Sequence, residues 1–179
     1  MALIVTIAGS PAHPSRSSLL ARHVATRLAG SGFTVESIDV RDLPAEDLLQ
    51  GRPESPRLRE ALGLVERADG VVVCSPVYKA AYTGVLKTFL DLLPQLGLTG
   101  KVVLPLLTGG TVAHVLALDY ALRPVLISLG AAQVVPGLFL LDKLLERTET
   151  GGLVIEVELG RRLDGIVDEF ARGVRRHAP

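Results

Sequence analysis

Four serines lie in one short polar segment near the start of the chain, Gly9-Ser10-Pro11-Ala12-His13-Pro14-Ser15-Arg16-Ser17-Ser18. The segment stands between a β-branched apolar run and a helical pattern of apolar residues. A helix N-terminus offers free backbone N–H groups and the positive end of the helix dipole, and serine hydroxyls add neutral donors. These donors suit a phosphate dianion. We therefore predict a phosphate site built from the four serines, Ser10, Ser15, Ser17 and Ser18.

A purely structural role is the alternative for this segment. Ser17 or Ser18 would then serve only as the N-cap of the following helix. One cap accounts for one serine and leaves the other serines and Arg16 without a role. The segment is neither a GxGxxG loop nor a Walker A loop, because the Gly-Lys-Ser/Thr ending of the latter is missing.

Two further segments carry residues that suit a flat ligand. In Pro76-Val77-Tyr78-Lys79-Ala80-Ala81, a tyrosine offers a stacking face and small residues let a ligand approach the backbone. In Thr108-Gly109-Gly110-Thr111, the glycines allow close approach or positive φ angles. His114 follows one turn later and is a candidate contact at the same place, although a single histidine is more often a surface or packing residue.

The elements that must position these segments alternate along the chain. Apolar runs without polar alternation predict buried strands, and apolar residues at spacings of three and four predict helices. The predicted strands are Leu3–Ala8, Phe33–Val40, Gly70–Cys74, Lys101–Leu107 and Ala132–Leu138. The predicted helices are Ser17–Leu28, Pro56–Arg67, Thr83–Leu93, Val112–Leu129 and a last helix from Leu159 to Val174.

This alternation predicts an α/β fold, a doubly wound five-stranded parallel sheet with helices on both faces and the flavodoxin-like order 2-1-3-4-5. Ligands of such sheets bind outside the carboxyl ends of the strands, where the winding reverses, so the three segments should meet there. Arg41–Pro56 is expected to be an ordered surface loop held down by Leu48 and Leu49. The polar stretch Asp142–Gly152 is a candidate mobile lid at the same end of the sheet.

The composition limits the class of partner. The 179 residues suit one domain, 1–179, and the 19 Lys and Arg balance the 19 Asp and Glu, so no charge surplus points to nucleic acid or to a membrane surface. No stretch approaches the roughly 18 unbroken apolar residues of a membrane span. The single cysteine excludes an intramolecular disulfide and a CxxC metal site. We therefore predict a small-molecule ligand, no metal and a cytoplasmic location.

Pro124 interrupts the fourth predicted helix. It lacks the N–H that would bond the carbonyl of Tyr120, and its ring crowds that carbonyl, so the helix must kink or widen there. The apolar rows also shift in phase near Leu118, as a one-residue π-bulge would cause, and such bulges are frequent at functional sites. This helix is apolar on nearly every side, which predicts that it forms an oligomer interface.

Several distant motifs occur together in a register that closely resembles one family. They are Ala8-Gly9-Ser10-Pro11, Pro14-Ser15-Arg16-Ser17-Ser18, Pro76 to Tyr82, Leu86-Lys87 and Thr108 to His114. Between about Leu3 and Gly130 the chain resembles the NADPH-dependent FMN reductases of two-component alkanesulfonate monooxygenase systems. The resemblance fades beyond Leu138.

The resemblance implies that the serine loop holds the FMN phosphate and that the loops after the third and fourth strands hold the isoalloxazine ring. Ala12 replaces an arginine common in the family, so His13 or Arg16 is expected to supply the charge. The implied cofactor-binding residues are Ser10, His13, Ser15, Arg16, Ser17, Ser18, Pro76, Val77, Tyr78, Lys79, Thr108, Gly109 and Gly110. Tyr120 resembles the inserted tyrosine of the family's π-helix at a tetramer interface, which implies a homodimer or homotetramer through this helix. His114 and Tyr120 are the candidate catalytic residues.

The implied reaction is hydride transfer from NADPH to FMN, with reduced FMN passed to an FMNH2-dependent monooxygenase in sulfur assimilation. The protein then needs no acid or base of its own. A quinone or azo reductase of the same fold with tightly held FMN is the alternative. A flavodoxin-type electron carrier fits less well, because such carriers are usually acidic. The choice between NADPH and NADH stays open, with Arg16 and Arg123 as candidates for a 2′-phosphate.

Overall fold

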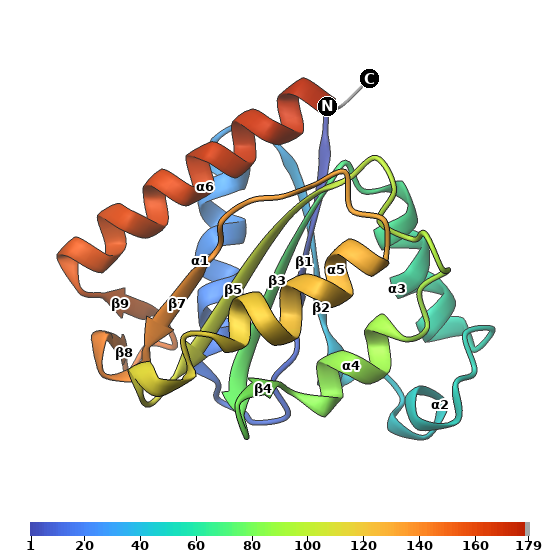
Figure 1. Ribbon diagram of the computed structural model, residues 1–179, viewed down its shortest axis with the longest axis horizontal. Coiled ribbons are helices and arrows are strands. Elements are labelled where there is room, and N and C mark those ends of the chain that lie inside the picture. Colours follow the sequence, from blue (N-terminus) through green and yellow to red (C-terminus); the bar gives the residue numbers. More distant parts are fainter. Residues whose placement is uncertain (178–179) are drawn as a thin grey trace.

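The computed structural model describes residues 1–177, and the last two residues of the predicted domain, 178 and 179, lie outside the described residues. Its central sheet has the hydrogen-bonded order β2-β1-β3-β5-β6, and β7 also pairs with β5 (Figure 1). These pairings are parallel, so the predicted order of five positions is confirmed. The strands are β1 (Leu3–Ala8), β2 (Thr34–Asp39), β3 (Gly70–Tyr78), β5 (Val102–Gly109), β6 (Gln133–Val134) and β7 (Leu138–Leu141).

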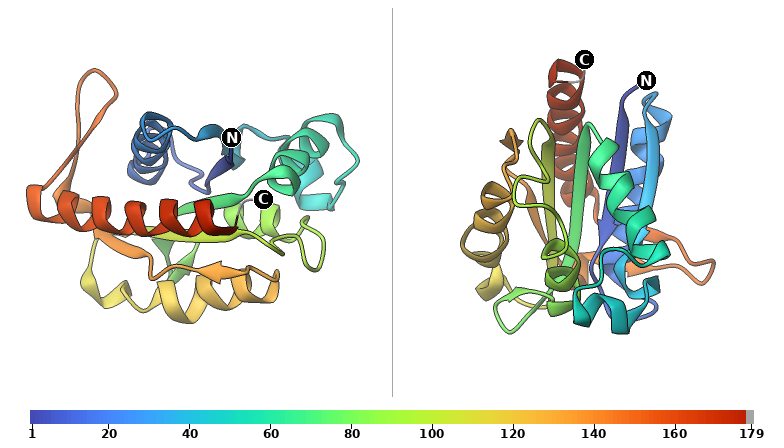
Figure 2. Two further views of the ribbon diagram at one scale, coloured as in Figure 1. Left: turned by 90° about the horizontal axis from the view of Figure 1, so that it is seen from above. Right: turned by 90° about the vertical axis from the view of Figure 1, so that its right-hand side faces the viewer.

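Helices cover both faces of the sheet, as predicted (Figure 2). The side chains of Val5, Val71 and Val103 face one way and join a core with α3 (Pro56–Arg67), α4 (Gly84–Leu90) and α5 (Arg123–Ser128). Their neighbours Ile4, Val72 and Leu104 face the other way and pack with α1 (Arg16–Gly30) and α6 (Val157–His177). β3 and β5 are apolar along most of their length because both of their faces are buried, whereas the edge strand β2 is largely polar and partly exposed.

The prediction of one continuous fifth strand over Ala132–Leu138 is wrong. Between β6 and β7 the chain passes through Pro136, which has no N–H for a ladder, and Gly137, whose φ is 75°. Arg123 bonds the carbonyls of Val134, Val135 and Pro136 at this break, at 2.8–3.4 Å. The guanidinium is thus engaged within the fold, which argues against Arg123 as a ligand for a nucleotide phosphate.

The segment Arg41–Pro56 was predicted to be a loop, and about half of it is helical. A 3-10 helix covers Val40–Asp42 and is followed by α2 (Ala45–Gln50), which has acidic residues in its first turn and ends at Gly51 in the left-handed conformation. Leu48 is buried as expected, whereas Leu49 is 77% exposed. The three prolines of this segment favoured the prediction of a loop, although none of them lies within α2.

The segment predicted to be a lid is an antiparallel hairpin. A 3-10 helix over Asp142–Leu144 leads into β8 (Leu145–Arg147), which pairs with β9 (Leu153–Ile155). Figure 2 shows this hairpin projecting beside α1. Its polar composition reflects one solvent-facing side, as is usual for a two-stranded ribbon.

The fourth predicted helix is broken, and the predicted π-bulge is confirmed. A 3-10 helix over Val112–His114 is followed by a π-helix over Leu118–Leu122 and then by α5. Pro124 lies just past the widened turn, where its missing N–H removes the constraint that would hold an α-helix. Within residues 1–177, no helix has both the length and the hydropathy needed to span a membrane.

The single cysteine provides a test of the packing at the end of β3. Cys74 has no exposed surface, and burial raises the pKa of its thiol. We expect this thiol to react with an alkylating reagent only after unfolding, because the thiolate is the reactive form. Mass spectrometry of native and urea-treated protein measures the labelling. Rapid labelling of the native protein would show that the sheet opens at this strand.

Candidate active site

The three segments singled out in the sequence meet at the carboxyl edge of the sheet. Ala8 at the end of β1 lies beside Cys74 in β3, and Pro76 lies beside Thr108 in β5. The turns that follow these strands therefore share one edge of the sheet, the lower edge in Figure 1. This is where the winding reverses in a doubly wound sheet.

The serine loop presents buried hydroxyls at the start of α1. Ser15 is the N-cap, and its Oγ lies 2.9 Å from Oγ of Ser17. Ser10 is also buried, and its Oγ accepts a hydrogen bond from the N–H of Ala12 at 3.2 Å. The N–H groups of Arg16 and Ser17 belong to the first turn of α1 and have no acceptor within the helix. The loop thus gathers neutral donors and a helix dipole, as predicted.

Ser18 and His13 line a cavity whose wall does not include Ser10, Ser15 or Ser17. They line a space of about 270 Å³ together with Asp39 and Arg41. Oγ of Ser18 is buried without a hydrogen-bond partner among residues 1–177. Burial raises the pKa of the Asp39 carboxyl, and the nearby Arg41 guanidinium opposes this shift. The carboxyl group on this wall makes the cavity less suited to an anion than the first turn of α1.

The segment after the third predicted strand is a tight hairpin rather than a loop. β3 continues through Pro76 and Val77 to Tyr78, and β4 (Ala81–Tyr82) folds back on it. The two residues of the turn, Lys79 and Ala80, have φ angles of 52° and 65°. Positive φ at both positions is typical of a type I′ turn, and it costs a non-glycine residue roughly 1–2 kcal/mol. Strain of this kind is concentrated at functional sites, and here it fixes the turn beside Tyr78.

Close contact with neighbouring atoms explains why residue 109 is a glycine but does not explain Gly110. Thr108 and Gly109 end β5 and are buried. A Cβ on Gly109 would lie 2.9 Å from Cζ of Phe139, whereas a Cβ on Gly110 would meet nothing within 4 Å. Neither glycine has a positive φ, so the expectation of such an angle is not met. Gly110 leaves the surface above the strand ends open for a planar group.

The two candidate catalytic residues lie together. His114 and Tyr120 line one hollow of about 420 Å³, whose wall also includes Ala80 of the strained turn. Tyr120 is 79% exposed, and it belongs to the π-helix. The broken helix therefore delivers both side chains to the mouth of the site.

Thr83 is a site residue that the sequence interpretation missed. Its Oγ1 donates to the carbonyl of Gly9 in the serine loop and accepts the N–H of Leu86 at 3.1 Å as the N-cap of α4. Its own N–H donates to Oγ of Ser75 at 3.1 Å. Thr83 thus ties the serine loop to the hairpin after β3. The signal was available, because a threonine that precedes an apolar helical run is a typical N-cap.

We expect Thr83→Val to loosen this junction. The variant loses the cap and leaves the carbonyl of Gly9 buried without its donor, so its free energy of unfolding should fall by about 1–2 kcal/mol. Urea denaturation measures this change. Thr83→Ser keeps the hydroxyl and serves as the control. A stable Thr83→Val protein alongside a destabilised Thr83→Ser protein would mean that the methyl group matters rather than the hydrogen bonds.

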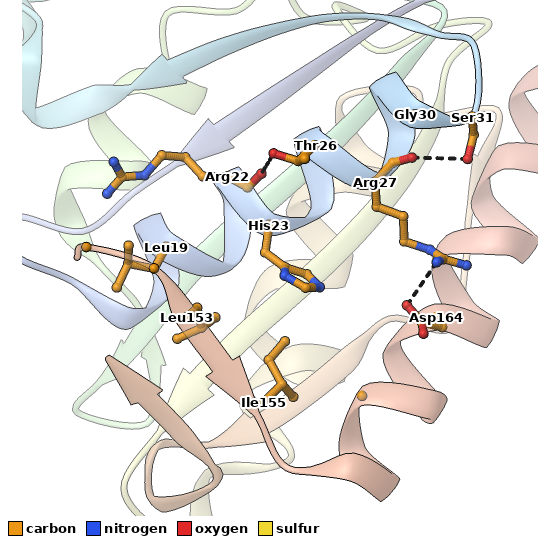
Figure 3. Close-up of a pocket in the computed structure, with 13 residues that line it drawn as sticks. Leu19, Arg22, His23, Thr26, Arg27, Gly30, Ser31, Leu153, Ile155 and Asp164 are labelled. Carbon is orange, nitrogen blue, oxygen red and sulfur yellow. Dashed lines mark hydrogen bonds and ion pairs between the residues drawn. The ribbon is translucent and has the colours of Figure 1, made fainter. Parts of the chain in front are cut away.

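A larger groove lies away from this edge. It has a volume of about 850 Å³ and runs between α1, β9 and α6 (Figure 3). Leu19, Leu153 and Ile155 give it apolar walls, and Arg27 pairs with Asp164 at 3.3 Å at one end. It contains no counterpart of the serine loop or the strained turn.

Comparison with known proteins shows which proteins this chain is similar to. The family described as "NADPH-dependent FMN reductase" matches residues 2–145. An FMN reductase (NADPH) of Escherichia coli K12 is 52% identical over 136 residues, which cover 76% of this chain and 71% of that protein. An FMN reductase (NADPH) of Pseudomonas putida KT2440 is 44% identical over 182 residues, covering 99% and 92%. The solved apo structure of an NADH:FMN oxidoreductase superposes with a TM-score of 0.88 at 41% identity, covering 97% of this chain and 90% of that one.

Proposed function

We propose that this chain, which belongs to the NADPH-dependent FMN reductase family, transfers a hydride from NAD(P)H to FMN at the carboxyl edge of its sheet. One observation carries the proposal. In a member of this family, a serine loop at the start of α1 lies at the same edge of the sheet as the strained β3–β4 turn. The carboxyl edge of the sheet therefore offers one surface that suits the phosphate of FMN and another that suits its ring.

The residues at this edge fit FMN in their chemistry. The hydroxyls of Ser10, Ser15 and Ser17 and the first N–H groups of α1 would hold the phosphate, with Arg16 adding positive charge. The ring would lie against the strand ends, between Pro76–Lys79 and Thr108–Gly110. His13 and Ser18 would act from the adjoining cavity, behind the loop.

FMN supplies the hydride-accepting chemistry when it is bound, so the chain needs only to bind, orient and exclude water. The rigid turn at Lys79 and Ala80 fixes the wall of the site. His114 and Tyr120 border the hollow above it and would contact the nicotinamide or the ring.

We propose that reduced FMN passes to an FMNH2-dependent monooxygenase of the alkanesulfonate type. The relatives named FMN reductase (NADPH) support this proposal, because a flavin that is reduced as a substrate leaves as a product. A cytoplasmic location is part of the same proposal, since the single cysteine suits a reducing compartment and NAD(P)H is supplied there.

We also propose that copies of the chain associate through the broken helix. Val112, Val115, Leu116 and Tyr120 expose apolar side chains on this segment, and Ile127 does so on α5. Contiguous exposed apolar surface is typical of an interface. A dimer or tetramer formed here would place the partner next to the hollow that holds His114.

Tyr120→Ala tests this interface. The side chain is exposed, so the stability of the isolated protomer should change by less than about 0.5 kcal/mol. We expect a smaller assembly in analytical ultracentrifugation or an altered KM for FMN. Leu49→Ala removes a similarly exposed side chain elsewhere and is the control. Unchanged assembly, FMN affinity and turnover in Tyr120→Ala would refute the role of this residue.

Steady-state oxidation of NADPH and of NADH, with free FMN varied, tests the proposed activity. We expect turnover that depends on added FMN and saturates with it. No flavin-dependent oxidation with either nicotinamide would contradict the proposal. Protein that is purified with stoichiometric FMN and reduces quinones or azo dyes without releasing the flavin would favour the alternative reductase.

A further inference from the structure

The β8–β9 hairpin contacts the serine loop from outside the family-matched part of the chain. The family match ends at residue 145, where β8 begins, and Arg147 lies two residues beyond it. A guanidinium N–H of Arg147 donates to the carbonyl of Pro14 at 3.3 Å. These two residues are 133 positions apart in the sequence.

The register of the hairpin explains why Arg147 points to α1. Arg147 pairs with Leu153, and Leu145 pairs with Ile155. Residues two apart on a strand and their cross-strand partners share one face, so Arg147 lies on the face of these three apolar residues. Leu145 is buried in the core beneath α1 and α6, and Leu153 and Ile155 lie alongside α1 (Figure 3). The apolar face thus seats the hairpin and carries Arg147 to the start of α1.

A second bond runs in the opposite direction. Nε of Arg16, in the first turn of α1, donates to the carbonyl of Leu145 at 2.9 Å. Each segment therefore offers one guanidinium to a carbonyl of the other. Two reciprocal bonds fix the position of the hairpin relative to the helix start more firmly than either bond alone.

Another arginine bonds a backbone carbonyl earlier in the serine loop. A guanidinium N–H of Arg41, just after β2, donates to the carbonyl of Ala12 at 2.8 Å. Carboxylates of Asp39 and Asp42 lie 3.5 Å from Nε of Arg41, so part of its charge is balanced locally. Arg147 has no acidic side chain within ion-pair distance among residues 1–177.

We propose that Arg147 is a positioning residue for the FMN phosphate, supplied by the C-terminal hairpin to a loop that has the neutral Ala12. Holding the carbonyl of Pro14 fixes the following residue, Ser15, whose Oγ contacts Oγ of Ser17. The two hydroxyls that would contact the phosphate are thereby kept in place. The positive charge of Arg147 and Arg16 adds attraction for a dianion. This inference rests on the proposed function and extends it to residues that the family match does not reach.

Binding of FMN and of riboflavin to wild type and to Arg147→Met tests the proposal, because riboflavin lacks the phosphate. We expect the Kd for FMN to rise about tenfold, the loss of one charge-assisted contact, and the Kd for riboflavin to stay nearly unchanged. Arg147→Lys, which keeps a donor and the charge, should recover most of the FMN affinity. Arg161→Ala removes an exposed arginine that pairs with Glu158 on α6, and it should bind FMN as wild type does.

Thermal unfolding of each variant separates lost binding from lost folding. Equal losses of FMN and riboflavin affinity in Arg147→Met, or no loss of FMN affinity, would overturn the role of Arg147. If wild type reduces FMN and Arg147→Met gives one of these two results, the role of Arg147 fails and the proposed function stands. If wild type itself neither binds nor reduces FMN, the proposed function fails first.

Discussion

Ser17→Asp is expected to lower the affinity for FMN at least a hundredfold while leaving riboflavin binding nearly intact. Ser17 is at the second position of α1, and its buried Oγ lies beside that of Ser15. A carboxylate there occupies the anion position itself and repels a phosphate. At about 4 Å and an effective dielectric constant near 20, such repulsion amounts to about 4 kcal/mol, and about 1.4 kcal/mol corresponds to a tenfold change in Kd.

The helix dipole favours a carboxylate in the first turn, and this offsets part of the cost of placing a charge at the buried position 17. Isothermal titration with both flavins measures the effect, and Ser17→Asn, which adds a similar bulk without charge, is the control. We expect the asparagine variant to lose much less FMN affinity. If the aspartate variant binds FMN as wild type does, the phosphate does not bind at the start of α1.

Gly9→Ala should destabilise the protein and weaken FMN binding together. A Cβ at this position would lie 2.5 Å from Cβ of Leu86 and 3.2 Å from its Cα, so the methyl group meets α4 next to its backbone. The N–H of Gly9 donates to the carbonyl of Cys74 at 2.8 Å, and its carbonyl accepts the hydroxyl of Thr83. The loop therefore cannot move aside without breaking these bonds. Overpacking of this kind costs about 3 kcal/mol.

Denaturant unfolding and FMN titration measure the two effects of Gly9→Ala. Gly30→Ala is the matched control, because a Cβ at the end of α1 meets nothing within 4 Å. Alanine is a better helix former than glycine, so this control should be unchanged or slightly more stable. A Gly9→Ala protein with wild-type stability would show that the serine loop is not packed tightly against Leu86 of α4.

The sequence predicts the parts of this molecule that depend on local pattern. The apolar runs of β1 and β5 and the apolar spacing of α3 mark elements that are buried in the expected way. Pro124 predicts the widened helix because one missing N–H has a fixed geometric consequence. The serine loop is recognisable because a helix start and several hydroxyls coincide.

Features that depend on long-range packing could not be predicted in this way. The turn at Lys79 and Ala80 contains no glycine or asparagine, so its left-handed backbone leaves no trace in the residue types. Arg147 reaches the start of α1 because of the register between β8 and β9, and this register cannot be read from the residue types. Leu49 looks like a core residue in the sequence and is exposed, because a short helix turns it outward.

A crystal structure of the chain with bound FMN tests the central claim most directly. We predict that the phosphate lies within about 3 Å of the N–H groups of Arg16 and Ser17 and of the Ser15 hydroxyl. The ring should lie between the β3–β4 turn and Gly109–Gly110. A phosphate found elsewhere, such as in the groove between α1, β9 and α6, would contradict the account.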